Sequence, residues 1–337
     1  MGRPFYSEPR FFLHKTHDLA EGVKQGQLRA LAKAITLIES HNTDHSPAAA
    51  ALLEELLPAA GNAMRIGISG VPGVGKSTFI EAFGLHLTRL GHKVAVLAVD
   101  PSSQISGGSI LGDKTRMEEL ARDPNAFIRP SPAGSTLGGV ARKTRETMLL
   151  CEAAGYDVVI VETVGVGQSE ITVASMVDFF LLLQLPGAGD ELQGIKKGVM
   201  EIADAILINK ADGDNRPRAE LARSQYVNAL HLIRAKSDHW QVPALLCSAL
   251  HGEGIAEVWE TIRDFRRAME ESGEFAEKRQ RQAGDWMWTM VMDELKQLFL
   301  HDPKVEALLP RLQEAVDRGI TTPGIAARRL LEAFRRP

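Results

Sequence analysis

The sequence has few cysteines, little net charge and no long apolar run, and each shortage excludes a class of protein. Only two cysteines, Cys151 and Cys247, occur in 337 residues, too few for a disulfide framework or a cysteine-based metal cluster within one chain. The net charge of −4 gives no whole-chain case for binding nucleic acid. No stretch approaches the roughly 20 apolar residues that span a bilayer, and no secretory h-region follows the first residues. We therefore expect a cytoplasmic protein with neither a membrane nor a nucleic-acid partner.

What the chain does contain is an ordinary globular composition, with 44% hydrophobic and 24% charged residues, so it can form a sizeable core. The first 60 residues show a helical pattern, because Leu28, Leu31, Ile35 and Ile38 recur at steps of three and four. We expect two or three helices there, as an N-terminal extension over residues 1–60.

Short β-rich runs alternate with helical segments through residues 61–265. This alternation predicts an α/β fold with a mostly parallel sheet flanked by helices. In such a sheet, ligands bind at the carboxyl ends of the strands. The expected strands are residues 65–69, 94–99, 158–162, 179–184, 205–209 and 244–247.

The β signal ends near Trp259, and residues 266–337 form a predicted C-terminal helical arm. A charge-dense segment over residues 260–282 is typical of a solvated helix. Beyond it, Trp288, Val291, Leu295 and Leu298 recur at helical spacing. These apolar faces need a partner, which is either the main domain or a second copy of the chain.

A phosphate-binding loop stands at the end of the first expected strand. Residues 70–77 satisfy G-x-x-x-x-G-K-S, between the strand at 65–69 and an apolar-periodic helix from Thr78. In this motif, backbone N–H groups and the helix N-terminus approach the phosphates, Lys76 reaches the β and γ oxygens, and the Ser77 hydroxyl ligates Mg²⁺. The predicted nucleotide contacts here are Gly70, Val71, Pro72, Gly73, Val74, Gly75, Lys76, Ser77 and Thr78.

Two carboxylates at expected strand ends, Asp100 and Glu162, are candidates for the magnesium site. Residues 162–165 also resemble the third GTPase motif, D-x-x-G, with glutamate in place of aspartate. In that interpretation, the N–H of Gly165 meets the γ-phosphate. The alternative is that Glu162 is only a helix-capping acid.

The base is predicted to be guanine because Asn209-Lys210-Ala211-Asp212 follows an apolar strand. Asp212 can accept hydrogen bonds from the guanine N1–H and 2-amino group, and adenine has no equivalent edge. Asn209 braces the loop, and the stem of Lys210 covers the base. After the next strand, Ser248, Ala249 and Leu250 match the loop that presents backbone N–H to guanine O6.

One residue type is missing from the expected catalytic apparatus. Small signalling GTPases have a water-orienting glutamine directly after D-x-x-G, whereas this chain has Val166 there and Gln168 two residues later. We therefore predict slow intrinsic hydrolysis that a partner or a dimer mate accelerates.

These motifs resemble the SIMIBI class of P-loop GTPases and, within it, the MeaB/ArgK family of GTPase chaperones of methylmalonyl-CoA mutase. The markers are residues 99–103 with 107–117, 162–170 and 186–198. The resemblance implies a P-loop GTPase that uses GTP/GDP and Mg²⁺. It also implies docking on an adenosylcobalamin-dependent mutase, gating of cofactor loading, and protection of that enzyme from inactivation.

The same resemblance assigns further residues. Asp113 is expected in the first switch loop near the metal, so that Lys76, Asp113, Glu162 and Gly165 form the catalytic set and Ser77, Asp100, Asp113 and Glu162 the metal set. Asp190, Gln193 and Lys196 belong to an additional switch that signals the nucleotide state to the mutase. A homodimer through the C-terminal helices is also implied.

Two other functions remain as alternatives. A nickel-delivering metallochaperone GTPase of the same class needs His-rich or Cys-rich ligands, and the ten histidines are scattered. A kinase for a transport protein needs ATP, which the guanine motif disfavours. Which cobalamin mutase is the client is not readable from the residues.

Overall fold

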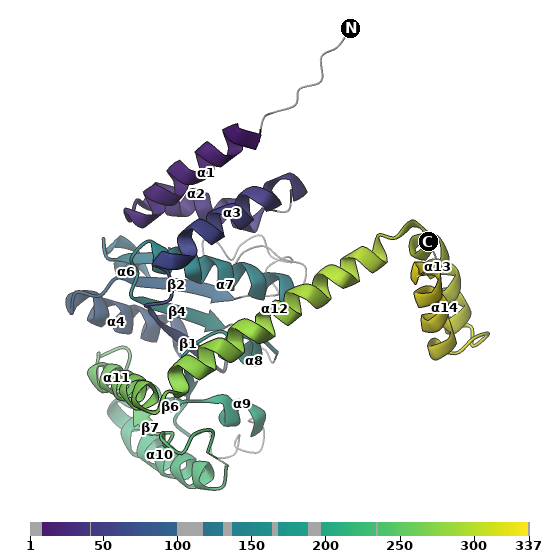
Figure 1. Cartoon of the computed structure of the whole chain (residues 1–337). Helices are drawn as coiled ribbons and strands as arrows, with labels where there is room; N and C mark the ends of the chain where they lie inside the picture. Colours follow the sequence, from purple (N-terminus) through teal and green to yellow (C-terminus); the bar gives the residue numbers. More distant parts are fainter. Residues whose placement is uncertain are drawn as a thin grey trace. The chain divides into compact units, whose positions relative to one another are not determined.

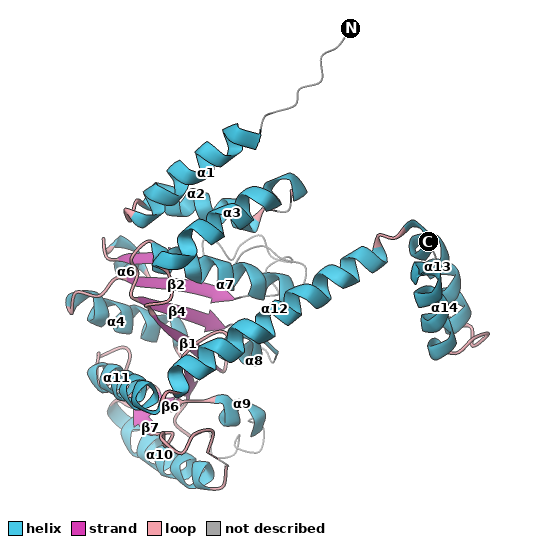
Figure 2. Cartoon of the chain, viewed as in Figure 1, coloured by secondary structure: helices cyan, strands magenta, loops and turns pink. Residues whose placement is uncertain are grey.

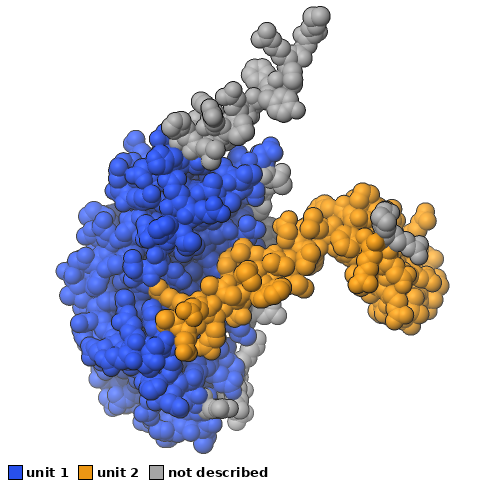
Figure 3. Space-filling view, viewed as in Figure 1, with its two compact units in different colours: residues 1–275 blue, residues 276–337 orange. Residues whose placement is uncertain are grey.

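The computed structural model describes residues 9–40, 42–99, 117–130, 137–163, 168–187, 197–233 and 235–335. The chain divides into two compact units, residues 1–275 and 276–337 (Figure 3). The finer boundaries predicted at residues 60/61 and 265/266 stay predictions. Within the described residues, no helix is both long enough and apolar enough to cross a bilayer.

A seven-stranded sheet with all its described pairings parallel forms the centre of the first unit, with helices on both faces (Figure 2). The strand order is β3-β2-β4-β1-β5-β6-β7. The bounds are β1 Met64–Gly70, β2 Val94–Val99, β3 Ala126–Arg129, β4 Val158–Thr163, β5 Phe179–Gln184, β6 Ala205–Ile208 and β7 Ala244–Leu246. The predicted α/β fold with a parallel sheet is confirmed, and β3 is a strand that the sequence pattern did not predict.

The strands β4 and β5, on either side of β1, are mostly apolar because helices bury both faces of the sheet. In β4, Val158 and Ile160 join the core on one face, while Val159 and Val161 join the core on the other. This two-residue alternation is the pleat of a strand. The sheet therefore separates two hydrophobic cores.

One core lies under α4 (Lys76–Arg89) and α11 (Ile255–Ser272), which contact each other. The stacked rings of Phe79 and Phe83 from α4 and the indole of Trp259 from α11 fill much of this space. The short helix α6 (Glu118–Arg122) contacts α4 beside β3. The phosphate-binding loop joins the end of β1 to the start of α4. The packing of α4 therefore fixes the direction in which this loop leaves the sheet.

The other core lies under α7 (Leu137–Ala153), α8 (Gln168–Ala174), α9 (Lys197–Ile202) and α10 (Arg216–His231). Three N-terminal helices add a further layer beside α7 (Figure 1). They are α1 (Pro9–Lys24), α2 (Leu28–Glu39) and α3 (Ser46–Leu56). The carboxylate of Glu39 pairs with Arg129, and its carbonyl accepts from Lys143 Nζ at 2.7 Å. The predicted N-terminal helices are thus part of the first unit.

The second unit is helical. It comprises most of α12 (Glu274–Leu300), followed by α13 (Pro303–Asp317) and α14 (Pro323–Arg335). Asp302 caps α13, because its carboxylate accepts from the N–H groups of Lys304 and Val305 at 2.9 and 3.2 Å. Along α12, by contrast, Trp288 and Leu295 are 62% and 51% exposed. Within the second unit, α13 and α14 therefore leave the predicted apolar face of α12 uncovered.

Candidate functional site

The phosphate-binding loop connects β1 to α4 through a sharp turn that only glycine allows. Gly75 has a φ of +92°, a left-handed conformation that costs side-chain-bearing residues energy. A Cβ at this position would lie 2.8 Å from Asn209 Nδ2. The glycine therefore permits both the turn into α4 and the close approach of the guanine loop.

Lys76 opens α4, and its ammonium group lies over the loop. Its Nζ donates to the carbonyl oxygens of Gly70 at 2.8 Å and Val71 at 3.4 Å. Burial lowers the pKa of Lys76, while the negative charges of Glu162 and Glu170 act to raise this pKa. A half-buried cation at the mouth of such a loop suits a polyphosphate ligand.

The carboxyl end of β4 places Glu162 close to the loop. Glu162 is opposite Ile68 of β1 and Ala98 of β2 in the strand register. The next residue, Thr163, donates its hydroxyl to the buried Ser69 hydroxyl at 2.8 Å. This bond ties the ends of β1 and β4 together, directly before the phosphate-binding loop.

The oxygen donors in this region suit Mg²⁺, which takes one or two carboxylates and keeps several waters. Ser77 is half-buried in the first turn of α4, and Glu162 is half-buried at the strand end. The other predicted members, Asp100, Asp113 and Gly165, lie outside the described residues. Within the part of the chain that is described, no group of three or more His, Cys, Asp or Glu could hold a metal ion.

Asn209, at the end of β6, connects three loops. Its side chain is buried, with Nδ2 donating to the Val74 carbonyl at 2.8 Å and Oδ1 accepting from the Ala249 N–H at 3.1 Å. A buried amide with both ends bonded fixes its neighbours strongly, because each broken bond leaves an unsatisfied polar group. The geometry suits the predicted bracing role, and it joins two residues that are 135 positions apart in the chain.

Lys210 and Asp212 complete the guanine loop. Lys210 has a φ of +58°, and it is the one non-glycine residue with positive φ in the described ranges. Its Nζ donates to the Gly73 carbonyl at 2.8 Å, which lays the side-chain stem across the loop. Asp212 accepts from the Ser248 hydroxyl at 2.6 Å. This bond fixes the orientation of the carboxylate.

The structure therefore brings the phosphate-binding loop, Glu162 and the two predicted base loops to the same edge of the sheet. Ser248 and Ala249 are buried, whereas Leu250 is 75% exposed. The predicted additional switch, Asp190, Gln193 and Lys196, lies outside the described residues. The ligand roles assigned to all these residues stay predictions. Glu170, five residues after Gly165, was absent from the predicted set.

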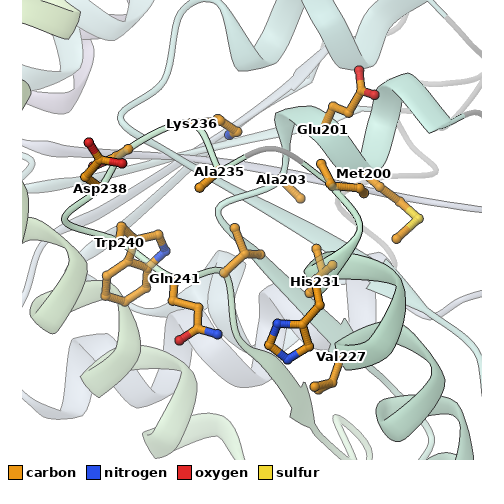
Figure 4. Close-up of a pocket in the computed structure, with 14 residues that line it drawn as sticks. Met200, Glu201, Ala203, Val227, His231, Ala235, Lys236, Asp238, Trp240 and Gln241 are labelled. Carbon is orange, nitrogen blue, oxygen red and sulfur yellow. The ribbon is translucent and has the colours of Figure 1, made fainter.

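A cavity of about 400 Å³ lies at the opposite edge of the sheet, where β6 and β7 begin (Figure 4). Met200 of α9, His231 of α10, and Trp240 and Gln241 before β7 are among its lining residues. Trp240 Nε1 donates to the Asp204 carbonyl at 2.8 Å, which fixes the indole. Because phosphates approach the other edge, this cavity is not the predicted nucleotide site.

Comparison with known proteins gives consistent similarities over most of the chain. The model of the family described as "Methylmalonyl Co-A mutase-associated GTPase MeaB" matches residues 31–304. The GTPase ArgK of Escherichia coli is 54% identical over 288 residues, covering 84% of this chain and 87% of ArgK. A mitochondrial methylmalonic aciduria type A homolog of Mus musculus is 49% identical over 327 residues, covering 94% and 79%. The crystal structure of an LAO/AO transport system kinase superposes with a TM-score of 0.77 and 43% identity, covering 96% and 98%.

Proposed function

Because the chain belongs to the MeaB family of mutase-associated GTPases, we propose that it uses a GTP cycle to control an adenosylcobalamin-dependent acyl-CoA mutase. In this cycle, the chain binds GTP with Mg²⁺ and hydrolyses it to GDP and phosphate. The proposed control consists of gating cofactor loading and protecting the mutase from inactivation. Methylmalonyl-CoA mutase is the proposed client, in line with the description of the family.

The observation that carries the choice of GTP is the geometry of Asp212. The Ser248 hydroxyl holds one carboxylate oxygen at 2.6 Å, and Asn209 fixes the start of the same loop. A carboxylate so oriented pairs with N1–H and the 2-amino group of guanine. Each hydrogen bond to a charged group contributes about 1.5–3 kcal/mol, so two of them discriminate strongly against adenine.

In the proposed reaction, the residues around the phosphates have distinct roles in hydrolysis. Water attacks the γ-phosphorus, the bond between the γ-phosphorus and the bridging β–γ oxygen breaks, and GDP carries away the negative charge that develops there. Lys76 and the loop N–H groups stabilise that charge, while Ser77 and Glu162 supply oxygen ligands or water contacts for Mg²⁺. Since Val166 stands where a water-orienting glutamine is found in small GTPases, we expect a slow basal rate that the mutase raises.

We also propose a homodimer formed through the C-terminal helices. Several large apolar side chains of α12, including Trp288, Met292 and Leu298, are more than half exposed in the single chain. Several large apolar side chains along one helix are rarely exposed to solvent in a soluble assembly, and they favour an interface with another protein chain. Trp288→Glu combined with Leu295→Glu is expected to give monomers by analytical ultracentrifugation, with nucleotide binding unchanged.

The function is tested by measuring nucleotide affinity and phosphate release, with and without methylmalonyl-CoA mutase. We expect micromolar or tighter GTP binding, at least ~100-fold weaker ATP binding, and faster phosphate release when the mutase is present. Lys76→Ala is expected to abolish hydrolysis, and this variant controls for contaminating phosphatases. Preference for ATP would reject the GTPase assignment and favour a kinase. Absence of binding to, and stimulation by, any cobalamin mutase would reject the chaperone assignment alone.

A further inference from the structure

Glu170, in the first turn of α8, is a buried acid that belongs to neither the phosphate-binding loop nor the guanine motif. Its residue is only 6% exposed, and glutamate is rarely buried without a charged or polar environment that compensates it. The neighbouring Ser169, 2% exposed, donates its hydroxyl to Glu170 Oε2 at 3.3 Å. The burial of the Glu170 carboxylate in the helix that follows β4 therefore indicates a specific role for this side chain.

The packing of α8 on β1 determines where Glu170 lies. A Cβ at Gly67 would be 2.9 Å from Val173 Cγ1, so the missing side chain lets the helix approach the strand closely. Ser69 is two residues further along β1 on the same face. Glu170 is three residues before Val173, one helical turn toward the start of α8. Because α8 follows β4 after its carboxyl end, that turn is at the edge of the sheet where the phosphate-binding loop begins.

The electrostatics of Lys76 agree with this placement. Two carboxylates, Glu162 and Glu170, act on its ammonium group and oppose the effect of burial on its pKa. They come from β4 and from α8, the consecutive elements on either side of residues 164–167. Lys76 thus donates to the carbonyl oxygens of its own loop, while the negative charges of two acids, one from the neighbouring strand and one from the neighbouring helix, act on its ammonium group.

We propose that Glu170 is a positioning residue for GTP hydrolysis, which together with Glu162 orients the Lys76 ammonium group toward the β and γ phosphate oxygens. The inference rests on the proposed GTPase cycle and deepens it. A charge that is oriented before the reaction stabilises the transition state more than the bound substrate. Loss of Glu170 therefore lowers kcat. It does not weaken GTP binding, because one negative charge fewer then faces the triphosphate.

The test is Glu170→Gln, which keeps the shape of the side chain and removes its charge. We expect kcat to fall by about tenfold or more, while the Kd values for GTP and GDP stay equal to those of the unchanged chain or become lower. Glu170→Asp keeps the carboxylate on a side chain that is one methylene shorter. We expect its kcat to lie between those of the unchanged chain and Glu170→Gln. Glu146→Gln is the matched control, since Glu146 is a buried acid of α7 that pairs with Arg142 at 3.0 Å and lies outside the site. Its kcat is expected to stay unchanged.

Two results would overturn the inference. One is an unchanged kcat in Glu170→Gln, or in Glu170→Asp if the glutamine variant does not fold. The other is parallel weakening of GTP and GDP binding with a lower unfolding temperature, which is the signature of a structural role alone. Failure of the inference differs from failure of the proposed function, because in the latter case the unchanged chain itself does not hydrolyse GTP.

Discussion

Asn209→Ala tests the geometry of the nucleotide site most directly, because one buried side chain joins the phosphate-binding loop to both base loops. The substitution removes the bond from Nδ2 to the Val74 carbonyl and the bond from the Ala249 N–H to Oδ1. Val74 and Ala249 are themselves buried, so their polar groups lose partners where water has little access. Each buried group left unsatisfied costs about 1–3 kcal/mol.

The two losses together predict a decrease of about 2–4 kcal/mol in the free energy of unfolding, allowing for some relaxation of the loops. Urea denaturation followed by circular dichroism measures this decrease. Affinities for GTP and GDP should fall by similar factors of at least ~10, since the base loop loses its orientation before either nucleotide binds. Titration with a fluorescent guanine nucleotide measures these affinities.

Asn228→Ala is the matched control, because Asn228 is an exposed residue of α10 and its loss should change stability by less than about 0.5 kcal/mol. The reasoning fails if Asn209→Ala unfolds like the control and binds GDP as the unchanged chain does. It also fails if GTP affinity falls while GDP affinity does not, because the expected loss comes from the orientation of the base loops, and the base is common to both nucleotides.

Three further predictions concern the backbone, a buried ion pair and a thiol. Gly75→Ala should abolish nucleotide binding, because the added methyl group would lie 2.8 Å from the side-chain amide nitrogen of Asn209. Gly91→Ala is the control, because Gly91 has the same φ of +92° but open space around it. This control should lower the free energy of unfolding by only about 1 kcal/mol. Glu152→Gln should destabilise the fold by about 3 kcal/mol in urea titrations, because the 1% exposed carboxylate pairs with Arg65 Nε at 2.6 Å. Burial raises the pKa of Cys247 to about 12 from 9.0. Its reaction with Ellman's reagent at pH 8 should therefore be slow until the protein unfolds, and the free energy of unfolding should fall as pH rises from 9 toward 12, where only the unfolded thiol loses its proton.

The fold was largely predictable because its strands are apolar runs between turn signals. β1, β2, β4, β5, β6 and β7 all lie within one or two residues of the expected ranges. β3 was missed because it has only four residues and pairs on one side alone, with Ile128 its single buried member. A short edge strand is too weak a pattern to separate from a loop.

The site was predictable as a set of motifs but not as a set of contacts. The motif residues could be named because G-x-x-x-x-G-K-S and N-K-x-D have fixed chemistry. The left-handed conformation of Lys210 was not predictable, since lysine has no local preference for it and the bond to the Gly73 carbonyl stabilises it. Glu170 was not predicted as part of the site, because its placement depends on the missing side chain of Gly67, far from it in sequence.

In the proposed GTP cycle, the strand order places base recognition and hydrolysis on different sides of the phosphate-binding loop. β1 lies between β4 and β5, and β6 follows β5, so the phosphate-binding loop has the acids of β4 and α8 on one side and the guanine loop of β6 on the other (Figure 1). We therefore expect changes on the β6 side to act on the base, which GTP and GDP share. We expect changes on the β4 side to act beside the γ-phosphate, which only GTP has. Asn209 bonds to Val74 and Ala249, whereas Glu170 accepts from Ser169. In the double variant, the loss of affinity should therefore come from the first change and the loss of kcat from the second, with free energies that add within about 0.5 kcal/mol.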